Sequence, residues 1–534
     1  MPVVFLANGV PGKELVDPAP SRIASRALPE WIEAAVAGGR KTIRIPPGRY
    51  FVRPENGTHL RLENLSDITI EAEGVELVCT ETTRAILIRN CRNLTIRGLT
   101  IDYDPLPFTQ GEIVAISADR KAHTIRIQEG YPPAESAYVF KHLIYTAAGD
   151  LRYGHYYAMD IEVLPDNHLR VFNLHPDKDG GQQVGDRVAI SARHLDGPYS
   201  PHSVHVIRSE ATRFDGVTLY ASPCFGFFET HSRGSVYQHC VIDRRDDRLL
   251  SLNADAFHSK FATRGPRIEE CRAFWQGDDA VNINGAYHLV LTASDGRLRV
   301  LAKGKMDIEA GDPVQLLTAG GRALPPARVE RIRSVGPATE ADTARVGSLR
   351  ILPGVAALLQ EAFVIELDRA VDLPTGSVLG ALNRMGNGFA VVGNRFGHNR
   401  SRGILVKASD GVVAGNTLVG CHLPAIKIAP EYIWLESGYS HHLRIEDNRI
   451  MDTRAESIRI ANTGPHAIHS DIRITGNHIE SEVTPLIRIH GLRDGYVAGN
   501  RLIGPAGADP AALLEVKDSP GLVREAGLIQ GDRE

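Results

Sequence analysis

Short runs of alternating apolar and polar residues, separated by polar bends, follow one another along most of the chain. "DITIEAEGVELVC", "AILIRNCRNLTIRGLTIDYD" and "SVHVIRSEATRFDGVTLYASP" are typical. Alternation with a period of two predicts short β-strands that each bury one face. A different pattern stands at residues 28–39, "LPEWIEAAVAGG", where Pro29 opens and a glycine pair closes a predicted helix. The pattern therefore predicts an all-β protein with one short helix near its start.

A unit of strand, bend and strand recurs in the C-terminal part of the chain. Its copies are "VVGNRF", "VVAGNTL", "RIEDNRI", "RITGNHI" and "YVAGNRL". Such a repeat is typical of a β-solenoid, in which each coil buries its apolar face against its neighbours. We expect the asparagines to stack inside the bends instead of serving as isolated turn residues. They recur at spacings of 22, 32, 29 and 23 residues, as Asn394, Asn416, Asn448, Asn477 and Asn500.

Two stretches interrupt this repeat with hairpin-like strands that lack the asparagine bend. Each contains a related phrase, "VGDRVAI" in the first and "AGDPVQL" in the second. We predict that they are small β-barrel domains inserted into the solenoid, where they would form the walls of a pocket, because insertions in repeat proteins gather on one face. The predicted segments are a cap helix and first coils (1–104), an inserted barrel (105–198), central coils (199–285), a second inserted barrel (286–388), and C-terminal coils with a cap (389–534).

Composition and charge narrow the class of partner. A net charge of -4 and 23% charged residues give no signature of a protein that binds nucleic acid or a membrane. The six cysteines form no C-x-x-C pair and are expected to be buried thiols. The start, "MPVVFLANGVPGKELVD", has no signal-peptide pattern. We therefore expect a cytoplasmic protein, or a bacterial periplasmic or secreted one if an export signal was removed, that is a monomer or a homodimer.

The segment 253–285, "NADAFHSKFATRGPRIEECRAFWQGDDAVNING", concentrates three aspartates. Asp255 and Asp278 are 23 residues apart, which matches the shortest spacing between coils. Residues one coil apart are stacked at about 4.8 Å, so these two carboxylates are expected to be neighbours. A bend near Gly277 would turn Asp279 outward beside Asp278, because a buried unpaired carboxylate is costly. The sequence thus predicts three carboxylates converging on one outer surface.

Crowded carboxylates cannot all remain ionised without cost, so one is expected to have a raised pKa and to keep its proton near neutrality. An acid beside ionised carboxylates is what inverting glycoside hydrolysis requires, since it needs a proton donor for the leaving oxygen and a base for the attacking water. The alternatives are a Ca²⁺ site or an acidic ladder that joins adjacent coils. Neither a P-loop nor a zinc-ligand spacing is present.

The motifs around these aspartates resemble two groups of enzymes. "NADAFH", "GDDAVNING" and "RGILVKAS" are similar to the N-x-D, D-D and R-x-K-like elements of the polygalacturonase-like parallel β-helix hydrolases. The G-H-G element of polygalacturonases is absent, and Arg402 and Lys407 are five residues apart instead of two, which argues against a galacturonate subsite. A closer resemblance, over nearly the whole chain, is to glycoside hydrolase family 110, the bacterial exo-acting α-1,3-galactosidases. It rests also on "GLTIDYDPLPFTQG" and "WLESG".

This resemblance implies a right-handed parallel β-helix with two inserted barrels, and it implies roles for the aspartates. Asp278 would be the general acid, while Asp255 and Asp279 would position and deprotonate the water; which of these two is the base stays open. Several residues near them are candidate sugar ligands, although each also has a structural interpretation, as a core histidine, an asparagine ladder, a solvated basic face or a core tryptophan. They are Asn253, His258, Asn282, Asn284, Arg402, Lys407, Trp434 and Glu436.

The resemblance therefore implies an inverting exo-α-galactosidase that needs no metal or cofactor and removes terminal α-1,3-linked galactose from an oligosaccharide or glycan, either a linear α-1,3-galactoside or one of blood-group B type. One alternative is another β-helix polysaccharide hydrolase. A second is a polysaccharide lyase, in which the aspartates hold Ca²⁺ and Arg402 or Lys407 abstracts a proton from a uronate. Another is a non-catalytic glycan-binding solenoid, such as a phage adhesin.

Overall fold

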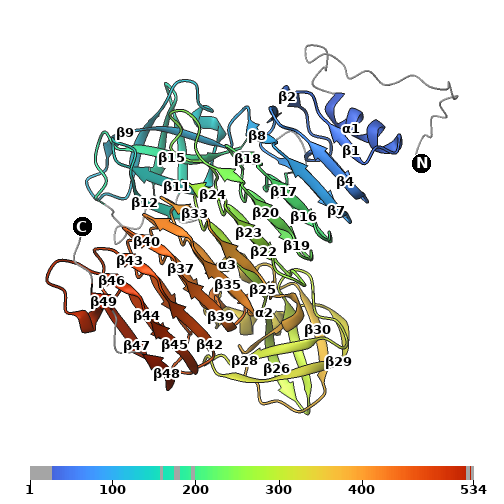
Figure 1. The fold of residues 1–534 in the computed structure, drawn as a ribbon, viewed down its shortest axis with the longest axis vertical. Coiled ribbons are helices and arrows are strands. Elements are labelled where there is room, and N and C mark those ends of the chain that lie inside the picture. The colour runs from blue at the N-terminus through green and yellow to red at the C-terminus, as the bar shows by residue number, and fades with distance from the viewer. Residues whose placement is uncertain (1–26, 157–159, 173–180, 194–198, 525–528, 531–534) are drawn as a thin grey trace.

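The computed structural model describes residues 27–156, 160–172, 181–193, 199–524 and 529–530. Most of the chain winds through three long parallel sheets, to which successive coils contribute in turn (Figure 1). In the described residues two of them have twelve strands, and the third has eleven parallel strands and one antiparallel strand, β38 (Glu436–Ser437). Pairing follows the coil length: Arg213 lies opposite Val236, and Val236 lies opposite Arg267 on the next coil. The predicted solenoid is confirmed as a parallel β-helix.

The strands of each sheet follow one another in order of pairing. Sheet 1 contains β1 (Thr42–Arg44), β4 (Ser66–Glu71), β7 (Arg92–Arg97), β17 (Arg213–Asp215), β20 (Val236–Gln238), β23 (Arg267–Glu269), β32 (Ala390–Val392), β35 (Gly411–Ala414), β39 (His441–Glu446), β42 (Ser470–Thr475), β45 (Asp494–Ala498) and β48 (Gly521–Arg524). Sheet 2 contains β3 (Thr58–Glu63), β6 (Arg84–Arg89), β16 (Val204–Ile207), β19 (Phe227–Thr230), β22 (Phe257–Lys260), β25 (Val281–Ala286), β34 (Ile404–Val406), β37 (Ile426–Ile428), β41 (Ile458–Ile460), β44 (Ile487–His490) and β47 (Leu514–Lys517), with β38 (Glu436–Ser437) paired to β25. Sheet 3 contains β2 (Gly48–Val52), β5 (Val75–Cys79), β8 (Thr100–Tyr103), β18 (Thr218–Leu219), β21 (Val241–Ile242), β24 (Arg272–Phe274), β33 (Arg395–Gly397), β36 (Thr417–Val419), β40 (Arg449–Met451), β43 (His478–Glu480), β46 (Arg501–Ile503) and β49 (Ile529–Gln530).

The three sheets enclose one continuous apolar core. It extends from Leu28 and Ile32 of helix α1 (Ala27–Ala37) to Leu513 and Leu514 near the other end. The helix thus covers the first coil and shields apolar side chains that no preceding coil would cover. The six cysteines are buried free thiols. Within the described residues, no helix is both long and apolar enough to cross a membrane.

A ladder of buried asparagines links the C-terminal coils. The five repeat asparagines are at most 1% exposed. The Nδ2 group of each donates to Oδ1 of the next at 2.8 to 2.9 Å, from Asn394 to Asn500. The same Oδ1 atoms accept the backbone N–H of the preceding asparagine at 3.0 Å. The predicted stacking inside the bends is confirmed, and it satisfies backbone groups that a bend would otherwise leave unpaired.

Two insertions leave the β-helix, and Figure 1 shows them on opposite sides of the central coils in this view. The second is a closed barrel with small helices attached, whereas the first forms a seven-stranded antiparallel sheet in the part of the chain that is described. The first contains β9 (Phe108–Ile116), β10 (His123–Ile127), η2 (Ala134–Ser136), β11 (Ala137–Tyr145), β12 (Leu151–Tyr156), β13 (Asp160–Leu164), β14 (His168–Phe172) and β15 (Arg187–Ala192). The barrel contains β26 (His288–Ser294), β27 (Arg297–Ala302), β28 (Pro313–Leu317), β29 (Ala323–Pro337), α2 (Glu340–Gly347), α3 (Pro353–Ala356), β30 (Glu361–Leu367) and β31 (Val378–Ala381), and η4 (Leu382–Arg384) follows it.

Each insertion begins and ends on strands that pair with each other. In the first, Phe108 of β9 lies opposite Ser191 of β15. In the barrel, His288 of β26 lies opposite Leu379 of β31. The chain therefore leaves the β-helix and returns to it at nearly the same place, and the parallel register continues across the gap.

Candidate active site

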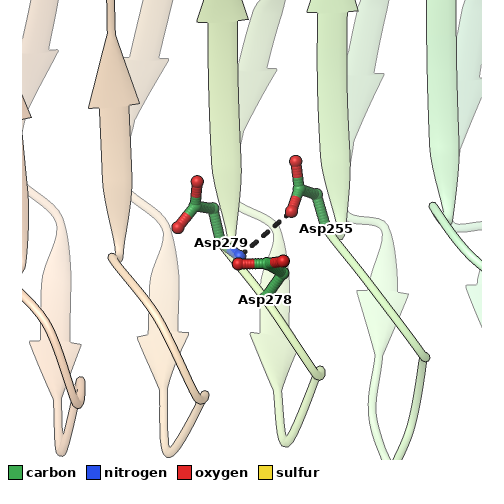
Figure 2. Close-up of side chains that lie close together, drawn as sticks. All are labelled: Asp255, Asp278 and Asp279. Atoms are coloured by element: carbon green, nitrogen blue, oxygen red, sulfur yellow. Dashed lines mark hydrogen bonds between the residues drawn. The ribbon is translucent and has the colours of Figure 1, made fainter. Parts of the chain in front are cut away.

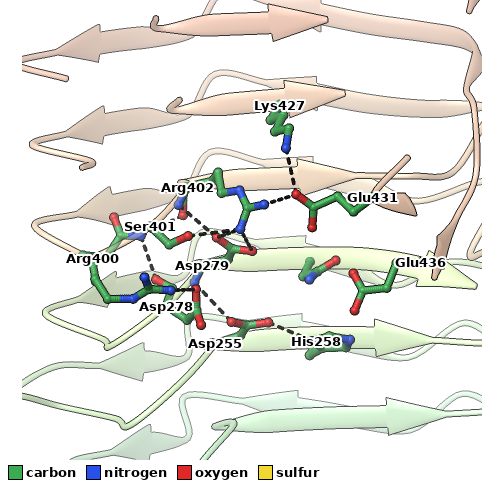
Figure 3. Close-up of polar contacts among 12 residues, drawn as sticks. Asp255, His258, Asp278, Asp279, Arg400, Ser401, Arg402, Lys427, Glu431 and Glu436 are labelled. Carbon is green, nitrogen blue, oxygen red and sulfur yellow. Dashed lines mark hydrogen bonds and ion pairs between the residues drawn. The ribbon is translucent and has the colours of Figure 1, made fainter. Parts of the chain in front are cut away.

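A pocket of about 280 Å³ lies over the middle coils of sheet 2. Its floor comes from residues in or just before β22, β25 and β34, and the loop around η5 (Tyr432–Trp434) and β38 faces this floor across the pocket (Figure 3). The residues that line it are Phe225, Asp255, His258, Asp278, Asp279, Asn282, Arg400, Ser401, Arg402, Leu423, Glu431, Trp434 and Glu436.

The three aspartates meet at one side of this pocket (Figure 2). One carboxylate oxygen from each lies within 4.8 Å of the other two. The register differs by one residue from the predicted spacing: Phe257 lies opposite Val281, which places Asp255 beside Asp279, 24 residues later, and not directly beside Asp278. Phe257 points into the core, while Asp255, two residues earlier, lines the pocket.

Asp278 is held by two cations. Lys141 Nζ donates to its Oδ2 at 2.8 Å, and the Arg400 guanidinium donates to its Oδ1 at 2.6 Å. Burial favours the neutral carboxyl, but the charges of Arg400 and Lys141 outweigh burial and hold the pKa of Asp278 well below its ordinary range. Asp278 is therefore an ionised carboxylate at neutral pH.

Asp255 and Asp279 are perturbed in the other direction. Burial, with the charge of Asp278, raises the pKa of Asp255 to about 8. Burial raises the pKa of Asp279 to about 6, although the nearby Arg402 guanidinium acts against it. The crowding of carboxylates was predicted to leave one of them protonated near neutrality, and the structure assigns this state to Asp255 and not to Asp278.

His258 lies against Asp255. Its Nδ1 is 2.7 Å from Asp255 Oδ2, and its Nε2 is 3.1 Å from the amide nitrogen of Asn284. Burial lowers the pKa of His258 to about 3, so the ring is neutral. Phe225 stacks on the ring with a centroid distance of 4.5 Å. These contacts fix the imidazole, and the imidazole in turn restricts the Asp255 carboxyl.

The side of the pocket away from Asp278 carries a second set of carboxylates. Strand β38 pairs antiparallel with the end of β25, with Glu436 opposite Ala286, and this pairing brings Glu436 close to Asn282. Lys407, which is fully buried, donates to Glu436 Oε2 at 2.8 Å and to Asn282 Oδ1 at 3.1 Å. Burial disfavours ionisation of Glu436, but the charges of Lys407, Lys303 and Lys260 together outweigh burial, so the pKa of Glu436 is lowered and the group is an ionised acceptor.

Arg402 joins the two sets of carboxylates. Its backbone N–H donates to Asp279 Oδ1 at 2.9 Å, and its guanidinium pairs with Glu431 and lies 3.4 Å from Asp279. Lys427 donates to Glu431 at 2.7 Å. Four pocket carboxylates thus have a nearby cation: Asp278 pairs with Lys141 and Arg400, Asp279 with Arg402, Glu431 with Arg402 and Lys427, and Glu436 with Lys407. Asp255 instead contacts the neutral His258.

Five of the eight predicted sugar ligands line the pocket, namely His258, Asn282, Arg402, Trp434 and Glu436. Asn284 and Lys407 are buried behind them, where they hold Asn282. The remaining candidate sugar ligand, Asn253, does not line the pocket: it is fully buried, and its amide nitrogen donates to the carbonyls of Pro107 at 2.7 Å and Pro223 at 3.2 Å.

Sequence reasoning missed several pocket residues. Arg400 and Glu431 stand beside motifs that had been recognised, two residues before Arg402 and three before Trp434, so a wider window could have found them. Lys141 gave no such signal, because it lies in the first insertion, 137 residues before Asp278.

Comparison with known proteins finds relatives of this chain among glycosidases. No protein-family model matches the chain. Two curated relatives, both named alpha-1,3-galactosidase B, match at 24% and 22% identity. The relative from Bacteroides thetaiotaomicron aligns over 72% of this chain and 63% of its own length, and that from Parabacteroides distasonis over 93% and 87%. The chain is a homologue of these galactosidases. This confirms the resemblance to glycoside hydrolase family 110, and it supports a glycoside hydrolase.

Among solved structures, the chain is similar to an endo-xylogalacturonan hydrolase from Aspergillus tubingensis, with 12% identity, 96% and 99% of the two chains covered and a TM-score of 0.42. It is also similar to the catalytic domain of a family 87 α-1,3-glucanase in complex with nigerose, with 10% identity, 98% and 70% covered and a TM-score of 0.42. The parallel β-helix itself rests on the strand pairing of this chain.

Proposed function

We propose that the chain is an exo-acting glycoside hydrolase that removes terminal α-1,3-linked galactose from a glycan with inversion at the anomeric carbon. The observation that carries this proposal is the cluster of Asp255, Asp278 and Asp279 at one side of a pocket lined on its other side by Glu431, Trp434 and Glu436. The sugar and linkage are taken from the names of the relatives.

The size of the pocket supports action at a chain end. Its volume of about 280 Å³ is at the lower end of small-molecule sites, which span about 300–1,000 Å³. Such a volume suits one terminal sugar better than an internal stretch of a polymer. The loop from η5 to β38, which closes one side, would stop a longer chain from passing through.

The charges of the pocket support a neutral hexose. Glu431 and Glu436 are ionised acceptors for sugar hydroxyls, and Trp434 offers an aromatic surface for the apolar face of the ring. The basic groups Arg402, Lys407 and Lys427 are already paired with carboxylates. The carboxylate of a uronate would therefore have to compete with Glu431 and Glu436 for these basic groups. A galactose hydroxyl can instead donate to the two glutamates.

In the proposed mechanism Asp278 is the general acid, as the family resemblance implies, and Asp255 and Asp279 hold and deprotonate the water. The Asp278 side chain is 16% exposed, against 5% for Asp255 and 2% for Asp279, so it is the carboxyl that a leaving group reaches most easily. Its two cations make it the strongest acid of the three. In the reactive form the proton is on Asp278 and Asp255 is ionised. This form is less populated than the one in which the proton is on Asp255.

Inversion is proposed from the resemblance alone. Inverting glycosidases usually hold their two carboxyls about 6.5–9.5 Å apart, whereas here the nearest oxygens of the three aspartates lie within 4.8 Å. Stereochemistry therefore has to be measured.

The deciding experiment is proton NMR of galactosyl-α-1,3-galactose with the purified protein, with and without a chelator, from the first minutes of reaction. We expect β-galactose to appear first, and chelation to have no effect. Early α-galactose would overturn inversion. A Ca²⁺-dependent unsaturated product from a uronate-containing glycan would indicate a lyase instead, and binding without release would indicate a glycan-binding solenoid.

A further inference from the structure

The first insertion reaches the aspartate cluster through Lys141. This residue lies on β11, which pairs with β12 on one side and β15 on the other, so it is anchored within the inserted sheet. Its side chain is 1% exposed. The ammonium donates to Asp278 Oδ2 at 2.8 Å and to the Gly277 carbonyl at 2.7 Å. An insertion otherwise outside the β-helix thus supplies a buried charge at the reacting centre.

The two contacts of Lys141 fix both the carboxylate of Asp278 and the peptide that precedes it. Arg400, from the β-helix itself, repeats this arrangement, with Nε donating to the Gly277 carbonyl at 2.8 Å and the guanidinium donating to Asp278. Gly277 fits tightly, because a Cβ at this position would lie 2.7 Å from the carbonyl oxygen of Asn253. Asp278 therefore projects from an immobilised backbone between two cations.

The Lys141–Asp278 pair cannot be replaced by solvent. A buried ammonium is costly without a partner, and burial lowers the pKa of Lys141, which the charge of Asp278 opposes. Removing the ammonium would leave Asp278 with Arg400 as its remaining close cation. The other titratable or charged groups that face this pair are Asp255, Asp279, Arg402 and the Cys224 thiol.

We propose that Lys141 is a positioning residue of the hydrolytic reaction, which orients Asp278 and stabilises the carboxylate that forms when Asp278 donates its proton. The inference rests on the proposed function. It makes the first insertion a part of the catalytic centre as well as a wall of the pocket.

Lys141 neither donates nor accepts a proton in the proposed reaction. The proton of Asp278 passes to the glycosidic oxygen as the bond between that oxygen and the anomeric carbon breaks, and the bonding electron pair stays on the leaving oxygen. The attacking water forms the new bond to the anomeric carbon and gives its proton to Asp255 or Asp279. Asp278 is then ionised beside an ammonium that has kept its three protons.

The test compares Lys141→Met and Lys141→Arg with Lys121→Met, which alters an exposed lysine of the same insertion. Lys141→Met should lower kcat by about 10²-fold or more, with a much smaller change in KM. It should also move the acidic limb of the kcat/KM profile up by about one pH unit or more, because one of the cations that lower the pKa of Asp278 is lost. Lys141→Arg should leave the acidic limb at the pH found for the wild type. Lys121→Met should change neither kcat nor the pH of the acidic limb.

If the wild type is active and Lys141→Met has the acidic limb of its kcat/KM profile at the same pH as the wild type, the role of Lys141 is overturned. The proposed function would still stand. A wild type that releases no galactose would overturn the proposed function. If Lys141→Met does not fold, Lys141→Gln, which is neutral and polar, is used for the same comparison.

A second measurement does not depend on turnover. The ion pair stabilises the fold only while Asp278 is ionised, so the deficit in Tm of Lys141→Met should be largest near neutral pH and should shrink as the pH falls below about 5. The same deficit at every pH would show that Lys141 contributes packing alone, and would overturn the proposal.

Discussion

Oδ1 of Asp255 accepts a hydrogen bond from the backbone N–H of Asp279 at 3.1 Å, across two neighbouring coils of the β-helix. This bond sets the two side chains next to each other in a buried part of the pocket, where water cannot stabilise two negative charges. Both carboxyls therefore bind a proton more tightly than an ordinary aspartate, and this property affects stability as well as chemistry.

The contribution of Asp255 to the free energy of unfolding should fall as the pH rises from about 4 to about 8. Asp255 has an ordinary pKa of about 3.9 in the unfolded chain and about 8 in the fold, so the folded state binds the extra proton between these values. The stabilisation is complete below pH 4 and is lost as the pH rises through 8. Asp255→Asn should flatten this dependence in urea unfolding at a series of pH values, whereas Asp295→Asn, in an exposed hairpin, should not. Equal slopes in Asp255→Asn and the wild type would contradict the assignment.

Asp278→Asn should show which aspartate is the general acid and which aspartates activate the water. If Asp278 protonates the leaving oxygen, the variant should lose about 10²–10⁴-fold in kcat on galactosyl-α-1,3-galactose, whose leaving group needs a proton. It should lose much less on a nitrophenyl α-galactoside, whose leaving group does not. Asp255→Asn and Asp279→Asn should lose activity on both substrates, because water activation is required for each. The same loss on both substrates in Asp278→Asn would move the acid role to another aspartate.

Glu436→Gln should weaken sugar binding without unfolding the protein. The glutamine keeps the shape of the side chain but removes the charge that makes it a strong acceptor, and a hydrogen bond to a charged group contributes about 1.5–3 kcal/mol. We expect KM to rise about 10–100-fold. Glu340→Gln, on the exposed face of α2, is the matched control. An unchanged KM would show that Glu436 does not contact the sugar.

Lys407→Met should act on stability first. The fully buried Lys407 is the hydrogen-bonded partner of Glu436, and breaking a buried pair by removing one member costs about 3–5 kcal/mol. Urea unfolding measures this loss, and the double variant Lys407→Met/Glu436→Gln should recover part of it. A double variant no more stable than the single one would show that the pair is not coupled.

Asn448→Ala should destabilise the C-terminal coils while leaving the active site intact. The substitution removes the link between Asn416 and Asn477 and leaves buried backbone groups unpaired, at a cost of about 1–3 kcal/mol per group. The midpoint of urea unfolding should fall, and kcat/KM at low temperature should not change. Gln360→Ala, at an exposed position, serves as the control.

Much of the architecture could be predicted because it repeats. The five asparagines recur in one frame, so a local pattern is enough to predict a stacked ladder and the coils that hold it. The three aspartates were also predictable as a cluster. Their detailed alignment was not, since coil lengths vary and the coil from β22 to β25 is 24 residues long, one more than the predicted spacing.

Contacts between distant segments could not be read from the sequence. Lys141 meets Asp278 only because the inserted sheet folds back over the coils, and the chain between them contains no periodic signal for this contact. The pKa values depend on the same contacts, which is why crowding alone did not identify the aspartate that keeps its proton.

The pairing of entry and exit strands in both insertions has a consequence for the order of folding. A solenoid grows by adding one coil to the last, and an excursion of about a hundred residues would normally delay the next coil through the entropy of closing a long loop. Because β26 pairs with β31, and β9 with β15, a collapsed insertion brings its own ends together. Once an insertion has folded, the following coil docks across a short connection, so growth can continue past each insertion with little kinetic penalty.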